Sequence, residues 1–66
     1  MTIILNGEAY VLREPRTIAA LLTDLNLDSR RVAVERNFLI VKRQAYEEIE
    51  LSDGDQVEIV NFVGGG

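Results

Sequence analysis

A single amphipathic helix constrains the fold of this chain more than any other feature of its sequence. Four apolar residues follow the i, i+3, i+4, i+7 spacing of one helical face: Ile18, Leu21, Leu22 and Leu25. Pro15 breaks the extended segment before them, and Thr17 is a favourable N-cap. Because one short helix can cover only one face of a sheet, we expect an α+β domain in which the helix packs across a hairpin.

The strand pattern begins with that hairpin. Thr2–Leu5 is short and apolar, and it leads into Asn6-Gly7, the pair best suited to the two positive φ angles of a type I′ turn. Residues 8–13 then return, with Leu5 opposite Glu8. The outer face of this hairpin is more apolar than exposure to water requires, so it serves either as core cover or as a docking patch. That face carries Thr2, Ile4, Ala9 and Val11.

Three further strands are expected, at residues 31–36, 39–42 and 56–63, with a tight turn at residues 52–55. The last strand is the longest and the most apolar, so it should lie in the centre of the sheet. If it pairs in parallel with the first strand, the result is a β-grasp. We therefore predict a mixed sheet of four to five strands with one main helix packed on one face.

The last strand runs into glycines. We predict a β-grasp domain over residues 1–63 and a flexible C-terminal tail at residues 64–66, formed by Gly64, Gly65 and Gly66. Residues without a β-carbon form a thin thread that can pass through a narrow channel and bring the Gly66 carboxylate into another protein's active site. The alternative is a frayed chain end or an expression scar.

Composition argues against chemistry inside the domain. With 66 residues and 47% hydrophobic content, the chain forms a small core, and few core positions could hold a buried polar site without loss of stability. It has no cysteine and no histidine, so thiolate nucleophiles, imidazole bases and the usual zinc ligands are missing. The acidic run Glu47-Glu48-Ile49-Glu50 alternates across an extended segment, and we interpret it as solvated surface. We expect no catalytic residue and no metal site.

Charge and hydropathy narrow the class of partner. The formal net charge is -4, from 11 acidic and 7 basic residues, which disfavours nucleic acid and anionic membranes as partners. A protein with a basic docking face is the natural complement. No apolar run approaches the roughly 18 residues that span a bilayer, and the N-terminus does not resemble a signal peptide. We therefore expect a cytoplasmic protein.

The order of these pieces resembles the ThiS family, the ubiquitin-like sulfur carriers of bacterial thiamin biosynthesis. The resemblance covers essentially the whole chain. Each matching motif alone is weakly specific for the family, whereas the order of the motifs and the compact length are specific together. It lies in Leu5-Asn6-Gly7, residues 18–25, Val34-Glu35-Arg36-Asn37, Asp53-Gly54-Asp55, Val57-Glu58-Ile59-Val60 and Phe62-Val63-Gly64-Gly65-Gly66. The resemblance implies a carrier that other proteins act on, and not an enzyme.

The resemblance also implies a route for sulfur. An adenylyltransferase of the ubiquitin-activating type would bind this domain and join AMP from ATP to the Gly66 carboxylate. A persulfide donor would supply sulfur, and the resulting thiocarboxylate would be handed to thiazole synthase. Mg²⁺ and the phosphate-binding groups would belong to the activating partner, and this chain would bind no cofactor.

Partner recognition is expected at an outward apolar patch near the tail. Its candidate residues are Phe62, Val60, Val63 and Ile4. The alternative for Phe62 is burial in the core, because aromatic side chains favour burial where geometry permits it.

Three other functions stay open at this stage. A sulfur carrier for molybdopterin synthesis also ends in paired glycines. A ubiquitin-like protein modifier would use the same tail to join protein lysines, and Lys42 is the one lysine available here for chain formation. A non-covalent β-grasp binding module would not need the tail.

Overall fold

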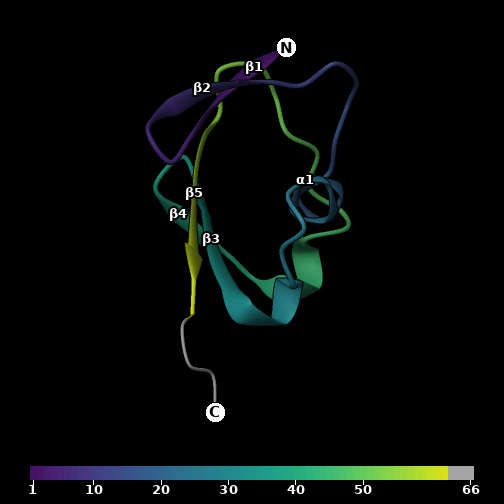
Figure 1. Ribbon diagram of the computed structural model, residues 1–66, viewed down its shortest axis with the longest axis vertical. Coiled ribbons are helices and arrows are strands. Elements are labelled where there is room, and N and C mark those ends of the chain that lie inside the picture. The colour runs from purple at the N-terminus through teal and green to yellow at the C-terminus, as the bar shows by residue number, and fades with distance from the viewer. Residues whose placement is uncertain (63–66) are drawn as a thin grey trace.

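One mixed sheet and one covering α-helix are the main elements of residues 1–62, the part of the chain that the computed structural model describes (Figure 1). The strands are β1 (Thr2–Leu5), β2 (Glu8–Val11), β3 (Val32–Arg36), β4 (Leu39–Val41) and β5 (Gln56–Asn61), and the helix is α1 (Ile18–Asp24). Short 3₁₀ helices at Ser29–Arg31 and Arg43–Ala45 precede β3 and follow β4. The sheet order is β2-β1-β5-β3-β4.

The pairing confirms the predicted topology. β5 lies in the centre, parallel to β1 on one side and antiparallel to β3 on the other. In Figure 1, β5 runs along the middle of the sheet and ends at the opposite end of the molecule from Met1, while α1 covers one face. A parallel central pair joined through a helix on one face is the β-grasp arrangement, so the predicted fold class is confirmed.

The first hairpin forms as its turn sequence predicts. Asn6 and Gly7 have φ of 49° and 84°, the two positive values of a type I′ turn. Leu5 pairs with Glu8, which confirms the expected register. β2 ends at Val11 and not at residue 13, because Thr2–Val11 is the last strand pair. Beyond it, Leu12 still donates from its N–H to the Met1 carbonyl at 2.8 Å and accepts from the Met1 amino group at 3.0 Å.

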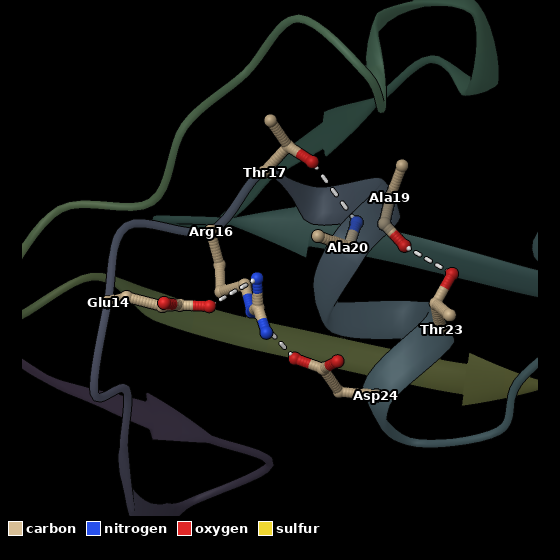
Figure 2. A network of polar contacts seen from close by, with 7 residues as sticks. All are labelled: Glu14, Arg16, Thr17, Ala19, Ala20, Thr23 and Asp24. Atoms are coloured by element: carbon tan, nitrogen blue, oxygen red, sulfur yellow. Dashed lines mark hydrogen bonds and ion pairs between the residues drawn. The ribbon is translucent and has the colours of Figure 1, made fainter.

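Two kinds of polar contact fix the ends of α1 (Figure 2). The Thr17 hydroxyl oxygen accepts a hydrogen bond from the Ala20 N–H at 3.1 Å, which confirms the predicted N-cap. Arg16, just before the cap, donates from Nε to Asp24 Oδ2 at 2.8 Å and pairs with Glu14 at 3.1 Å (Figure 2). The arginine thereby joins the segment before the helix to its last residue.

The core fills the space between α1 and the facing side of the sheet. Its buried apolar residues are Ile3, Leu12, Ile18, Leu21, Leu22, Val32, Val34, Tyr46, Leu51, Val57 and Ile59. Val57 and Ile59 face the helix as predicted. Residues 49–51 lie beside the helix start, where Ile18 N–H donates to Ile49 O at 3.0 Å and Leu51 N–H donates to Arg16 O at 2.9 Å. This extended segment therefore closes the far side of the core.

The turn before β5 contains a buried carboxylate. Asp55 is only 6% exposed, and it accepts hydrogen bonds from Ser52 N–H at 2.8 Å, Arg36 Nε at 2.9 Å and Asn37 Nδ2 at 3.1 Å. The predicted tight turn is confirmed, with Gly54 at φ 84°. The contacts to Arg36 and Asn37 also tie this turn to the end of β3.

Candidate partner-binding face

The sheet face opposite α1 is open because the chain has one α-helix in residues 1–62 and that helix covers the other face. On β5 the outward residues alternate with the buried Val57 and Ile59. Val60 is 57% exposed and Phe62, just after the strand, is 55% exposed. The alternative in which Phe62 is buried in the core is therefore wrong.

The predicted patch is only partly gathered in one place. Ile4 is 37% exposed and lies on the same face, but it pairs with Gln56, at the far end of β5 from Phe62. Ile4 and Val60 are thus separated by roughly 13 Å along the strand, at about 3.3 Å per residue. The structure brings Val60 and Phe62 together and places Ile4 at the other end of the face.

The end of β5 is anchored beside the start of β3. Asn61 pairs with Val32, and the Phe62 N–H donates to the Arg31 carbonyl at 2.7 Å. The direction of the chain is therefore fixed up to Phe62. The predicted strand of residues 56–63 ends at Asn61 in the structure, and Val63, with the glycine tail, lies outside the described residues. The proposed roles of Gly64, Gly65 and Gly66 lie outside them as well.

A groove on the open face was missed at the sequence level. It has a volume of about 200 Å³ and runs across β5, β3 and β4. Its lining includes Ala33, Glu35, Phe38, Ile40, Glu58 and Val60. Phe38, Leu39 and Ile40 are 75%, 73% and 79% exposed, although all are large and apolar. The signal for this region was present in the sequence as an unbroken apolar run at residues 38–41, which lacks the alternation of a half-buried strand.

The described residues contain neither a candidate metal site nor a candidate membrane-spanning helix. Among residues 1–62, no group of three or more acidic, histidine or cysteine side chains is placed to hold a metal ion. No helix in that range is long and apolar enough to cross a membrane.

Comparison with known proteins decides between the remaining families. The ThiS family model matches residues 3–66. The chain belongs to the ThiS family. A sulfur carrier protein ThiS of Bacillus subtilis is 46% identical over 54 residues, which cover 82% of each chain. The crystal structure of a thiamine biosynthesis protein (ThiS) from Geobacter metallireducens covers all of both chains with a TM-score of 0.85 and 32% identity.

Some relatives of this family member are much longer. A thiazole synthase of Paramagnetospirillum magneticum is 47% identical over 66 residues, and one of Magnetococcus marinus is 42% identical over 66 residues. In both cases the match takes in 100% of this chain but only 20% of the relative. The chain therefore spans about a fifth of the length of these two relatives.

Proposed function

We propose that this chain is a sulfur carrier of thiamin biosynthesis, with the carboxylate of Gly66 as the group that bears sulfur. The observation that carries the proposal is the ThiS family match, which extends over residues 3–66 and so includes the glycines. The Bacillus relative named as a sulfur carrier and the ThiS crystal structure support it. The chain acts as a protein substrate of its partners and not as an enzyme.

The chemistry explains why the carboxylate must be activated. A carboxylate is a poor acyl donor because its leaving group would be oxide. Attack of a Gly66 oxygen on the α-phosphorus of ATP expels pyrophosphate and gives an acyl adenylate, from which AMP leaves readily. The terminal sulfur of a persulfide then displaces AMP, and a thiol cleaves the resulting S–S bond to leave a thiocarboxylate and a disulfide.

Three partners follow from this route. An adenylyltransferase of the ubiquitin-activating type supplies ATP and Mg²⁺, and a persulfide donor supplies sulfur. Thiazole synthase receives the sulfur, and the two long relatives of that name support this partner because each contains a region similar to the whole of this chain. ATP and thiols are plentiful in the cytoplasm, where we place the carrier.

The open face is the proposed docking surface. Val60 and Phe62 are apolar, exposed and next to the end of β5, so they are the candidate anchors, with Val63 beyond them. Ile4 would contact a separate part of the partner, because it lies at the other end of the face. The acidic character of the chain favours a basic partner surface.

Gly65→Val tests the proposed chemistry. A β-branched side chain beside Gly66 would widen the thread and crowd its carbonyl, so we expect loss of ATP-pyrophosphate exchange with the activating enzyme. Thermal unfolding should match that of the wild type. Exchange at the wild-type rate by the folded variant would contradict the proposal.

A further inference from the structure

The turn between β3 and β4 contains a residue in a strained conformation. Asn37 and Phe38 have φ of 52° and 70°, both in the left-handed region. The corresponding turn of the first hairpin uses Asn6 and Gly7, with φ of 49° and 84°. Glycine adopts such angles without a steric penalty. In a residue with a side chain, such as Phe38, they bring the β-carbon too close to the backbone carbonyl oxygen, which costs free energy.

Neighbouring hydrogen bonds hold this turn in place. The Asn37 N–H donates to Gln56 O at 2.7 Å, and its side-chain oxygen accepts from Gln56 N–H at 2.9 Å. Its Nδ2 donates to the buried Asp55 at 3.1 Å. Asn37 is therefore fixed to β5 and to the turn before it. These hydrogen bonds keep the adjacent Phe38 in its left-handed conformation.

The conformation of Phe38 adds little to the stability of the isolated chain. Phe38 is 75% exposed, so its ring contributes little to the core. Phe38 instead lines the groove on the open face, together with Ile40 on β4 and Val60 on β5. A strained backbone that presents an exposed aromatic ring is a feature expected of a binding surface.

The same groove is lined by two glutamates on neighbouring strands. Glu35 on β3 pairs directly with Glu58 on β5, and both line the groove. Like charges directly opposite in a sheet are destabilising. No ion pair within residues 1–62 includes either of them. A cation from outside the chain would relieve this repulsion.

We propose that the groove binds an arginine side chain of the activating enzyme. Its guanidinium lies between Glu35 and Glu58, and its alkyl stem packs on Phe38 and Ile40. Arginine fits this surface because its planar group can bond to two carboxylates and also stack on an aromatic ring. The inference rests on the proposed function, which supplies the partner, and it makes Phe38 a specificity residue for that partner.

Phe38→Gly separates binding from folding. Glycine relieves the strained φ, so we expect the melting temperature to stay the same or rise while the Kd for the activating enzyme increases about tenfold. Leu39→Ala is the matched control, because Leu39 is similarly exposed but points to the other face of β4 and does not line the groove. It lines a second hollow, which shares only Ile40 with the groove. The Kd of this control should not change.

Glu35→Gln with Glu58→Gln tests the charge. We expect the double variant to fold at least as stably as the wild type, to bind the activating enzyme several-fold more weakly, and to lose much of the salt dependence of binding. Wild-type Kd values for Phe38→Gly and for the double variant, with Gly66 still adenylated, would overturn the inference and leave the proposed function intact. If the wild-type chain is not adenylated at all, the proposed function fails, and the inference fails with it.

Discussion

Phe62 is the last residue whose position the structure describes, and its side chain is 55% exposed next to the anchored end of β5. We predict that Phe62→Asp weakens binding to the activating enzyme by at least about tenfold, since exposed aromatic anchors dominate many interfaces. The melting temperature should hardly change, because the ring is outside the core. Titration calorimetry and thermal unfolding measure the two effects. A large fall in the melting temperature would instead show that the ring supports the fold.

Asp55 should make the stability of the fold dependent on acid. Burial disfavours its charged form, but the hydrogen bonds from Ser52, Arg36 and Asn37 outweigh burial and lower its pKa below the ordinary value of 3.8. Because the folded state then binds a proton less tightly than the unfolded chain, the contribution of Asp55 is complete above that ordinary value. It is lost as the pH falls through the lower folded pKa.

Denaturant unfolding of Asp55→Asn, from neutral pH down to about pH 2, measures this contribution. We expect the variant to be less stable than the wild type at neutral pH and to show a flatter decline in acid. Asp28→Asn is the comparison on the surface. A side-chain hydrogen bond from Arg30 is the main cause that lowers the Asp28 pKa to about 2, but solvent screens this exposed pair, so its loss should change the acid profile less than the loss of Asp55 does. Identical acid profiles for Asp55→Asn and the wild type would refute the assigned role.

At the scale of single elements, the Thr17 cap is the contact most readily tested. Thr17→Ala removes the acceptor of the Ala20 N–H and should lower the free energy of unfolding by about 1 kcal/mol. Thr23→Ala is the matched control, because its hydroxyl donates to the Ala19 carbonyl within the same helix at 3.2 Å (Figure 2). That bond competes with the helix ladder, so its loss should be nearly neutral. Equal destabilisation by the two variants would contradict the capping role.

Elements with a local code were predictable from the sequence. The Asn6-Gly7 turn, the Thr17 cap and the stripe that begins at Ile18 each depend on residues a few positions apart, and each is confirmed. The burial of Asp55 was not predicted, because its partners Arg36 and Asn37 are 19 and 18 residues away in the chain. Contacts of that kind depend on the packing of the whole sheet.

The candidate site divides in the same way. The exposure of Val60 and Phe62 followed from alternation along the last strand, which is a local property. The groove could not be predicted in this way, because Phe38, Glu35 and Glu58 come together only when β5 lies beside β3. Phe38 also has a left-handed backbone conformation at a turn position where glycine is usual. The residue preferences of turns therefore do not predict this conformation.

For the molecule as a whole, the fold covers one face of the sheet with α1 and leaves the other face free (Figure 1). The central strand ends at one extremity of the molecule, away from Met1, and Phe62, the last described residue, lies at that end of the open face. A partner can therefore hold the open face while it works on the tail. Under the proposed function, the small domain supplies recognition and its partners supply the reactive groups.

The most direct test of the carrier function is the intact mass of the protein after incubation with the activating enzyme, ATP, Mg²⁺ and a persulfide donor. We predict the replacement of one oxygen by one sulfur, with fragmentation placing the sulfur on Gly66, and transfer of that sulfur on addition of thiazole synthase and its other substrates. An unchanged mass after confirmed binding of the activating enzyme would contradict the account, as would covalent attachment of the chain to other proteins in place of sulfur.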